Sequence, residues 1–340
     1  MKTELNASLK SYQTFGIDVT TKALTKVSTK EEFLSAWQNP AFQEQPKLIL
    51  GGGSNVLFTK DFLGLVIINR IKGKEIIHED NEHVWVKFLS GEVWHESVLW
   101  TITQGWSGIE NMSLIPGTIG AAPMQNIGAY GVELKDVFES LEAIELATGK
   151  IENFNKEQCK FGYRESIFKN THKNQYFIYS VTLKLNKQPH FNTQYGDIQQ
   201  VLAEMGVNQN NLTTKAVSDA VITIRKSKLP NPSELGNSGS FFKNPYITQQ
   251  HFNELQSKYP DIKGFPVEDE LVKVPAAWLI EQCGWKGKRV GNCGSHIRQP
   301  LVLVNYGGAN GNEIYALALQ IKQSVKDKFG IEIHPEVNII

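Results

Sequence analysis

Two glycine-rich stretches have the residue types and spacing that suit binding of a phosphate or a flat ligand. The first, residues 51–55, begins with three consecutive glycines, which can take positive φ and turn successive backbone N–H groups toward one phosphate oxygen. It lacks the Gly-Lys-Ser of a P-loop, and Val56 stands where the dinucleotide fingerprint has its third glycine. By itself, a Gly-Gly-Gly-Ser-Asn sequence is more often a tight hairpin turn than a ligand loop, and a second glycine-rich stretch changes that balance.

The second stretch, residues 116–131, combines four glycines with three alanines over sixteen residues. Such small side chains let a ligand approach the backbone closely. A loop of this length without regular structure is uncommon in a compact domain unless it binds something or is disordered. Its Ile, Met and Tyr residues argue against disorder. The stretch is therefore predicted to bind a ligand.

The surrounding elements follow from hydrophobic periodicity and turn signals. The polar, turn-rich residues 186–214 predict a connection, and the whole pattern favours an α+β fold over an alternating doubly wound one. The predicted elements are a short helix opened by a capping box at residues 28–31, strands at 47–50, 56–58 and 65–68, a helix at 92–104, mostly strands over 140–185, helices at 216–225, 275–282 and about 312–329, and a final strand at 331–337.

Composition limits the classes of function. A length of 340 residues suggests about two domains, and 35 basic against 35 acidic residues give no global field that would favour nucleic acid or an acidic membrane. The first residues contain no apolar run that would serve as a signal-peptide core, and no stretch reaches about 18 apolar residues. The protein is therefore expected in the cytoplasm.

The cysteines do not indicate a disulfide framework, because there are only three: Cys159, Cys283 and Cys293. Cys283, Cys293 and His296 would be candidate metal ligands, but there is no CxxC pair and no clear fourth ligand. Packed thiols and a hydrogen-bonded histidine are expected instead, and no metal is predicted.

Several segments, spread nearly from end to end, make the chain resemble the UDP-N-acetylenolpyruvoylglucosamine reductase family. These segments are residues 14–16 (Thr-Phe-Gly), 50–57 (Leu-Gly-Gly-Gly-Ser-Asn-Val-Leu), 115–120 (Ile-Pro-Gly-Thr-Ile-Gly), 125–131 (Gln-Asn-Ile-Gly-Ala-Tyr-Gly), 161–166 (Phe-Gly-Tyr-Arg-Glu-Ser), 239–245 (Gly-Ser-Phe-Phe-Lys-Asn-Pro) and 335–337 (Pro-Glu-Val). One small departure is Gln13, where the family usually has asparagine.

The resemblance implies a flavin-binding fold of the vanillyl-alcohol-oxidase type, with two α+β subdomains for FAD and a further α+β domain for substrate. We expect FAD-binding subdomains at residues 1–70 and 71–214, a substrate domain at 215–330, and residues 331–340 packing back near the flavin. No His or Cys matches a covalent tether, so FAD is expected to bind noncovalently. The implied FAD-binding residues are Gly51, Gly52, Gly53, Ser54, Asn55, Pro116, Gly117, Gly120, Ala121, Gln125, Asn126, Gly128, Ala129 and Gly131.

The resemblance also implies the reaction, reduction of an enolpyruvyl sugar nucleotide to UDP-N-acetylmuramate during bacterial peptidoglycan synthesis. Hydride delivery to the terminal carbon leaves negative charge beside the carboxylate, which calls for a fixed cation. Arg164 is the implied cation, and Ser240 is the implied donor of the proton. Glu336 matches the position that polarises the intermediate, and Glu332, two residues before His334, is expected to be inert.

Sugar-nucleotide contacts are implied for Tyr195, Lys228, Asn244 and Gln299, and the Tyr195 loop is that of the longer family subtype. Near residue 265 the family is expected to have a tyrosine whose hydroxyl contacts the diphosphate. This chain has Phe265, which lacks the hydroxyl for that contact. NADPH as reductant is implied by the family alone, because no Rossmann unit is legible. The expected partner is a small UDP-sugar, with no nucleic acid or membrane, and the protein is expected to be a monomer.

Two rival functions remain. The first is an oxidase of the same flavin fold that takes hydride from an alcohol or sugar, which would not need Ser240 as an acid. The second is a nucleotide-sugar binding protein without catalysis, which would be inert to NADPH. Against both, the glycine loops, Arg164, Ser240 and Glu336 occur together and supply each part that the reduction needs.

Overall fold

In the computed structural model, which describes residues 2–267 and 270–340, the chain forms two units that alternate along the sequence. The first unit takes the described residues up to Ala7, then Thr21–Gly52 and Leu63–Ser227; the second takes Ser8–Thr20, Gly53–Phe62 and Lys228–Ile340. The first glycine loop is therefore divided: Gly51 and Gly52 belong to the first unit, and residues 53–55 belong to the second.

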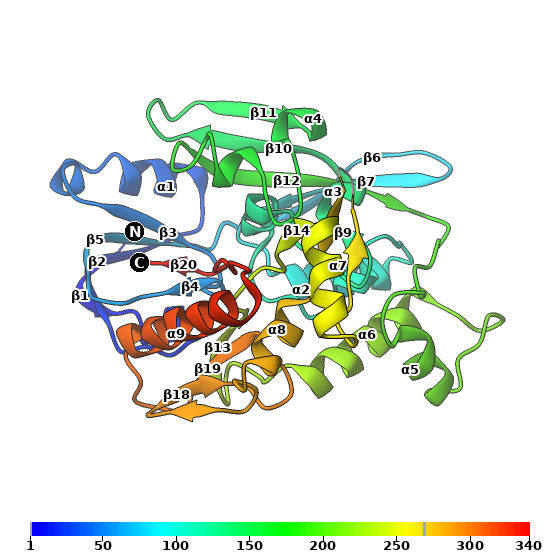
Figure 1. Ribbon diagram of the computed structural model, residues 1–340. Coiled ribbons are helices and arrows are strands. Elements are labelled where there is room, and N and C mark those ends of the chain that lie inside the picture. Colours follow the sequence, from blue (N-terminus) through cyan, green and yellow to red (C-terminus); the bar gives the residue numbers. More distant parts are fainter. Residues whose placement is uncertain (1, 268–269) are drawn as a thin grey trace. The chain divides into compact units, whose positions relative to one another are not determined.

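One sheet of the first unit has the strand order β1-β2-β5-β3 and is drawn in blue in Figure 1. Strands β3 and β5 are parallel, with Leu50 opposite Ile68, so the first glycine loop begins where the β3 ladder ends. Phe33 and Ala36 of helix α1 join the same buried cluster as Leu65 and Ile67 of β5. The elements are β1 (Thr3–Ser8), β2 (Thr20–Val27), α1 (Lys30–Trp37), β3 (Lys47–Leu50) and β5 (Phe62–Asn69).

The predicted capping box of α1 does not form, and the N-cap of the helix lies one residue later than predicted. Thr29, not Ser28, is the N-cap residue, and its hydroxyl accepts a hydrogen bond from Glu32 N at 3.1 Å. The Glu32 carboxylate in turn accepts from Ser28 N at 2.7 Å. Both residues are good caps, and the glutamate that can reach back selects between them.

The second sheet of the first unit is antiparallel, in the order β11-β10-β12-β7-β6 (Figure 1). Its buried face packs with Trp94 and Val98 of helix α2, which confirms the predicted helix apart from its ends. The strands predicted over 140–185 are confirmed by β10, β11 and β12. The elements are β6 (Lys74–Glu79), β7 (His83–Leu89), α2 (Trp94–Thr103), β10 (Phe138–Glu145), β11 (Ile151–Asn155) and β12 (Tyr176–Asn186).

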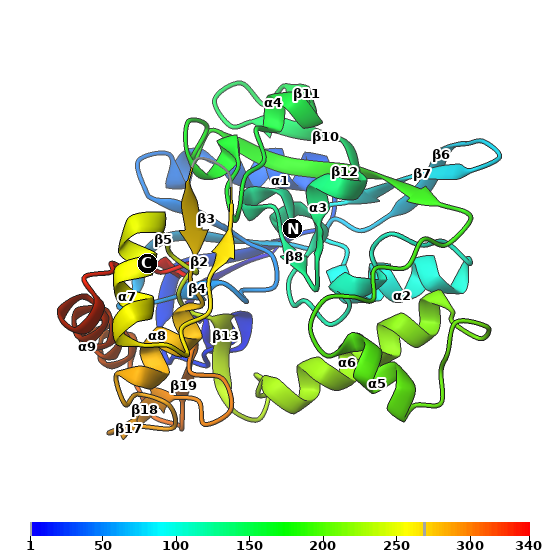
Figure 2. The same cartoon turned by 45° about the vertical axis from the view of Figure 1, so that its right-hand side comes forward.

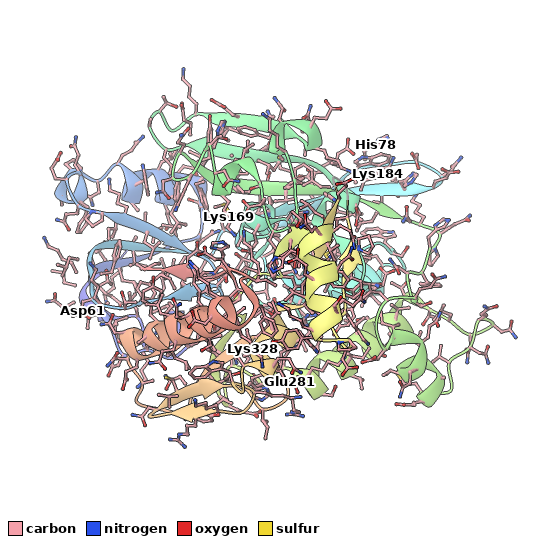
Figure 3. The ribbon with its side chains drawn as sticks, viewed as in Figure 1. Asp61, His78, Lys169, Lys184, Glu281 and Lys328 are labelled. Carbon is pink, nitrogen blue, oxygen red and sulfur yellow. The ribbon has the colours of Figure 1, made fainter. Side chains whose placement is uncertain are left out.

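Aromatic and cationic contacts brace the exposed end of this sheet. His78 and Lys184, labelled in Figure 3, lie on either side of β7 in the strand order and both contact Trp85. The His78 ring is 4.7 Å from the Trp85 ring, and Lys184 Nζ is 4.9 Å from it. Such contacts hold β6 and β12 to β7 where few buried side chains do so.

The stretch after β12 is not only a connection, as predicted, because it contains helix α5 (Ile198–Glu204). Only Ile198 and Leu202 of this short helix are buried, four residues apart, which is too weak an apolar pattern to be recognised. They pack against helix α6 (Thr214–Lys228), which extends beyond the predicted 216–225 at both ends. Figure 2 shows the two helices side by side.

The second unit contains a sheet in the order β13-β19-β18-β17 and two helices predicted from the sequence, α8 and α9. Helix α9 contacts α8, β18 and β19, and ends at Gly330, whose φ of 67° suits a left-handed cap. Lys328, labelled in Figure 3, donates a hydrogen bond from the end of α9 to Gln282 O at the end of α8. The elements are β13 (Gly236–Ser240), α8 (Ala276–Gln282), β17 (Arg289–Val290), β18 (Cys293–Ser295), β19 (Val302–Asn305) and α9 (Gly311–Phe329).

The predicted final strand at 331–337 is wrong. The alternation of buried Ile331, Ile333 and Val337 with exposed residues is real, but it belongs to an extended segment outside any ladder. Pro335 has no N–H to donate and forms only an isolated bridge with Phe242. The strand that forms, β20 (Asn338–Ile339), lies after this segment and runs parallel to β4 (Val56–Leu57).

The remaining elements are short. They are β8 (Gly128–Ala129), β9 (Val132–Glu133), α3 (Leu134–Val137), α4 (Lys156–Cys159), β14 (Tyr246–Thr248), α7 (Gln249–Lys258), β15 (Phe265–Pro266), β16 (Leu271–Lys273), and 3-10 turns at Lys10–Tyr12, Pro40–Phe42, Glu110–Met112 (η3), Ile119–Ala121 (η4), Pro123–Gln125 (η5) and Ile167–Lys169. Among the described residues, no helix has the length and apolar character needed to cross a membrane.

Candidate active site

The first glycine loop connects β3 to β4, as predicted, and is shaped by contacts that exclude side chains. A Cβ on Gly53, whose φ is 61°, would lie 2.0 Å from Tyr12 O, within the second unit. A Cβ on Gly52 would lie 3.0 Å from Gly117 Cα, within the first unit. Across the described residues, the amides of Gly52, Gly53 and Ser54 donate no hydrogen bond. This backbone is therefore available to an anion.

The second glycine-rich stretch is an ordered chain of 3-10 turns, η4 and η5, followed by the β8–β9 hairpin. Ile119 N donates to Glu92 O and Gly120 N to Ser90 O, both at 2.9 Å, which ties the stretch to the start of α2. A Cβ on Gly120 would lie 2.5 Å from Ser90 Cβ, so glycine is needed for this approach. Pro116 and Ala121 are exposed beside it. The two glycine stretches also touch each other, because a Cβ on Gly51 would meet the Thr118 side chain.

Arg164 is held against the second stretch. Its Nη2 donates to Gly128 O at 2.8 Å and its Nη1 to Asn126 O at 3.4 Å. Its backbone has a φ of 57°, in a tight turn closed by Gly162 and Glu165. A non-glycine residue in the left-handed region is strained, and such strain persists where the surrounding structure specifies it. The guanidinium is thus directed by backbone carbonyls of the glycine-rich stretch.

Asn126 shapes this arrangement instead of offering its side chain to a ligand. It is fully buried, with a φ of 44°. Its amide donates to Glu133 Oε2 at 2.9 Å and to Gly162 O at 3.0 Å, and its Oδ1 accepts from Lys135 N at 3.0 Å. Both amide N–H groups and Oδ1 are therefore bonded inside the protein, and this buried side chain can contribute to cofactor binding only through the backbone that it fixes.

These features fit a flavin dinucleotide. The unpaired amides of the first loop suit a pyrophosphate, and the small residues of the second stretch suit close contact with a flat ring. The residues present need no lysine and no Rossmann helix to hold such a group. The predicted cofactor residues of the first unit lie close to one another. Those of the second unit also lie close to one another.

In the second unit, Ser240 and Glu336 lie on neighbouring segments. Glu336 N donates to Phe241 O at 2.8 Å, and Glu336 O accepts from Asn55 Nδ2 at 3.3 Å. Ser240 ends β13 after an irregularity in its pairing with β19 and is half-buried, and its hydroxyl has no hydrogen-bond partner among the described residues. Phe241, directly after it, is fully buried and anchors this end of the strand.

The predicted sugar-nucleotide residues divide between the units. In the first, Tyr195 is 54% exposed and meets the Tyr130 ring edge-on at 6.5 Å. In the second, Asn244 Oδ1 accepts from Ala276 N at 3.0 Å at the start of α8. Gln299 has a buried Oε1 without a partner among the described residues. Lys228 is exposed at the end of α6, and Phe265 is exposed on β15.

Arg225 is a residue that the sequence analysis missed. Its Nε is buried and has no hydrogen-bond partner among the described residues. Burial lowers the pKa of Arg225, and the positive charge of nearby Arg164 lowers it further, while Tyr130 acts in the opposite direction. The positive charges of Arg164 and Arg225 act on each other, and an anion bound near them would relieve this repulsion. The sequence feature that could have indicated Arg225 is its place one helical turn before Lys228, a predicted substrate-binding residue.

His95, on α2, belongs to the same neighbourhood. Its Nδ1 accepts a hydrogen bond from Leu114 N at 2.9 Å, which requires the neutral ring. Burial lowers the pKa of His95, and the charge of Arg225 lowers it as well. His95 therefore supports the cationic cluster of Arg164 and Arg225 without adding to its charge.

The cysteines considered as metal ligands make only local contacts. Cys283 and Cys293 donate through sulfur to Ser324 O and Val290 O, each at 3.4 Å, and burial raises the pKa of both thiols. No group of three His, Cys, Asp or Glu side chains within residues 2–267 and 270–340 is arranged to hold a metal ion.

Comparison with known proteins agrees with these observations. Residues 21–155 match the profile of the FAD binding domain, and residues 231–340 match the C-terminal domain of UDP-N-acetylenolpyruvoylglucosamine reductase. A solved UDP-N-acetylenolpyruvylglucosamine reductase from Thermus caldophilus has a TM-score of 0.65, covering 99% of this chain and 98% of its own at 23% identity. This likeness, with the FAD-binding profile, confirms the predicted α+β flavin-binding fold.

Curated relatives named UDP-N-acetylenolpyruvoylglucosamine reductase match over the whole length. The protein from Amoebophilus asiaticus is 53% identical over 340 residues, and that from Flavobacterium johnsoniae is 51% identical over 341, each covering all of both chains. The Burkholderia ambifaria protein is 45% identical over 96% of this chain and 94% of its own. Identity at this level, without a gap in coverage, places the chain in the UDP-N-acetylenolpyruvoylglucosamine reductase family.

Proposed function

We propose that the chain reduces UDP-N-acetylglucosamine enolpyruvate to UDP-N-acetylmuramate, with FAD and NADPH, in the synthesis of peptidoglycan precursors. FAD and NADPH are the cofactors of its family. Beyond family membership, the proposal rests on one observation: Ser240 and Glu336 lie on neighbouring segments. Glu336 N donates to Phe241 O, the residue after Ser240, at 2.8 Å. A hydroxyl and a carboxylate held on adjacent segments suit delivery of a proton.

The glycine stretches would hold FAD noncovalently, with the free amides of the first loop at its pyrophosphate. When bound, FAD supplies hydride taken from NADPH to the terminal enolpyruvyl carbon. The first loop needs glycine because its backbone lies too close to other backbone atoms for a side chain, as where Gly53 approaches Tyr12 O. The predicted set from Pro116 to Gly131 would line the ring system, with Asn126 fixing its shape from inside.

Arg164 would stabilise the negative charge that develops beside the substrate carboxylate. Its Nη2 donates to Gly128 O and its Nη1 to Asn126 O, and these two bonds fix the direction in which the charged guanidinium points. Preorganised charge of this kind is worth several kcal/mol in a water-excluded site, of the order of 3–4 kcal/mol for one group. Arg225 would add a second cation, since its buried Nε lacks a protein acceptor.

Ser240 would donate the proton to the carbon that becomes carbanionic, and Glu336 would polarise the intermediate. A carbanion is basic enough to take a proton from a hydroxyl that is positioned for it. The Ser240 hydroxyl suits this task because no described residue engages it. Tyr195, Lys228, Asn244 and Gln299 would bind the sugar nucleotide.

We further propose that the protein belongs to the longer subtype defined by the Tyr195 loop. We also propose FAD subdomains at 1–70 and 71–214, a substrate domain at 215–330, a monomeric state, a cytoplasmic location, and no nucleic-acid or membrane partner.

Stopped-flow spectroscopy of the purified FAD protein without oxygen tests the proposal. NADPH should bleach the flavin, and the enolpyruvyl substrate should restore its colour. Ser240→Ala should slow the return of colour by about 10²–10⁴-fold while leaving the bleaching step unchanged. Ser238→Ala is the matched control, because Ser238 is on the same strand and its buried hydroxyl lacks a partner among the described residues.

Other outcomes would select the rivals. Rapid recovery of colour with oxygen alone would favour an oxidase of the same fold. A protein that binds no flavin, or whose flavin ignores NADPH, would favour a sugar-nucleotide binding protein. Equal effects of Ser240→Ala and Ser238→Ala would remove Ser240 from the mechanism.

A further inference from the structure

The segment that carries Tyr195 is exposed along most of its length. Of residues 188–197, only Phe191 and Thr193 are not exposed. Among the described residues, the backbone N–H groups of residues 188–196 donate no hydrogen bond. Asn192 bonds to two other segments: its carbonyl accepts from Asn111 at 2.7 Å, and its side chain donates to Gly131 O at 3.2 Å. Of these two bonds, the one to Asn111 is the shorter and the better buried.

Asn111 links this segment to the second glycine-rich stretch. Its side chain is 1% exposed, and its amide nitrogen donates both to Asn192 O and, at 2.9 Å, to Tyr130 O. One amide group therefore joins two stretches about 60 residues apart in the chain. The rings of Tyr130 and Tyr195, from the same two stretches, have their centroids 6.5 Å apart. Its Oδ1 is buried without a partner within the described residues, so the two donated bonds are what the residue contributes.

The base of this link is rigid. Asn111 lies in the 3-10 turn η3, where Trp94 Nε1 donates to Met112 O at 3.0 Å. Ser113 and Ser218 share a buried hydrogen bond of 2.7 Å, which joins the turn to α6. The side of the Tyr195 segment formed by Pro189 and Phe191 instead lines an open pocket of about 430 Å³, so packing there does little to hold it.

We propose that Asn111 is a positioning residue, which holds the Tyr195 segment against residues 130–131 and thereby sets the affinity for the sugar nucleotide without touching it. This inference rests on the proposed contact of Tyr195 with the substrate. Hydrogen bonds from one buried amide to two carbonyls stabilise both, and their loss leaves two carbonyls to be solvated. Substrate binding would then have to order the segment as well as engage it, which lowers apparent affinity.

The experiment compares Asn111→Ala with Ser113→Ala in the FAD holoenzyme. Both variants remove a buried hydrogen bond from the same turn, but only Asn111 contacts the Tyr195 segment. Limited chymotrypsin cleavage at Phe191, identified by mass spectrometry, should become faster in Asn111→Ala and stay at the wild-type rate in Ser113→Ala. The KM for the enolpyruvyl substrate should rise about tenfold in Asn111→Ala, with kcat changed less than about twofold.

A Tyr195→Ala background separates the inference from the proposed function. If Asn111 acts through Tyr195, adding Asn111→Ala to Tyr195→Ala should raise KM by less than about twofold more. An unchanged rate of cleavage at Phe191 in Asn111→Ala would overturn the tether, whatever the kinetics show. Faster cleavage in Asn111→Ala, with an unchanged KM in both Asn111→Ala and Tyr195→Ala, would keep the tether but overturn its link to substrate affinity. It would also remove Tyr195 from the proposed binding site.

Discussion

The two units hold their functional groups by different means. In the first, Arg164 is directed by its own side chain, which donates to two carbonyls of the glycine-rich stretch from a strained backbone with a φ of 57°. In the second, Ser240 and Glu336 are placed by backbone bonds between extended segments, such as Glu336 N to Phe241 O at 2.8 Å.

Because of this difference, a substitution in the first unit should change both stability and activity, whereas one in the second unit should change activity alone. In the first unit the cation is also a structural tie, so its replacement should affect both activity and folding. In the second unit the backbone makes the contacts, so a side chain there can be replaced with little effect on the fold. Arg164 and Ser240 variants should therefore differ in stability even where both lose activity.

The largest combined effect on activity and stability is expected from Arg164→Lys. A lysine has one ammonium in place of a planar fork, so it cannot donate to both Gly128 O and Asn126 O and still face an anion. We expect kcat to fall about 10²–10³-fold. Stability should fall by about 1 kcal/mol through the lost hydrogen bond. Urea unfolding measured beside the kinetics checks both, with Ser240→Ala as the comparison, whose unfolding curve should match the wild type. Equal stability of the two variants would contradict the contrast between the units.

A smaller effect is expected from Gly53→Ala, which tests how the backbone of the second unit shapes the first loop. The added Cβ would lie 2.0 Å from Tyr12 O, so the loop must move. Strain of about 1–3 kcal/mol should weaken FAD binding by about 10–100-fold. Flavin content after dialysis, read from the visible spectrum, is the measurement.

Gly105→Ala is the matched control for Gly53→Ala. Its φ of 80° is also positive, but no atom lies within 4 Å of the added Cβ. It should lose about 1 kcal/mol of stability from the backbone alone and keep its full flavin content. A flavin loss equal to that of Gly53→Ala would show that positive φ, not the close approach at residue 53, is what matters.

The smallest effect is expected from Glu332→Gln, set against Glu336→Gln. Glu332 forms an exposed ion pair with Lys326 at 2.7 Å, and this hydrogen bond lowers the pKa of the Glu332 carboxyl. The pair therefore adds its small stability above the ordinary glutamate pKa near 4.5 and loses it as the pH falls through the lower folded value. Glu332→Gln should leave kcat unchanged and slightly reduce the fall in the free energy of unfolding at acid pH. Glu336→Gln should reduce kcat by about 10²-fold. A comparable kcat loss in both variants would contradict the role given to Glu336.

Much of the molecule could be predicted from local sequence. Helices α2, α8 and α9 have clear apolar faces and glycine or proline near their ends, and β3 is a short apolar run before three glycines. The glycine stretches were recognised by composition alone, because positive φ and close backbone approach leave few other residues possible. The family resemblance added the roles of Arg164, Ser240 and Glu336, which residue types alone would not assign.

What local sequence does not specify is which groups meet across long chain separations. The alternation over 331–337 predicted a strand, but whether an extended segment joins a ladder depends on a partner edge, and here only residues 338–339 find one, beside β4. Arg225 belongs to no recognisable motif, and only tertiary packing buries its Nε and brings it under the influence of the Arg164 charge. Asn111 gave no signal because its two acceptors lie 19 and 81 residues away along the chain. Periodicity and turn chemistry are encoded within a few residues, whereas burial and hydrogen-bond pairing arise only when distant segments pack.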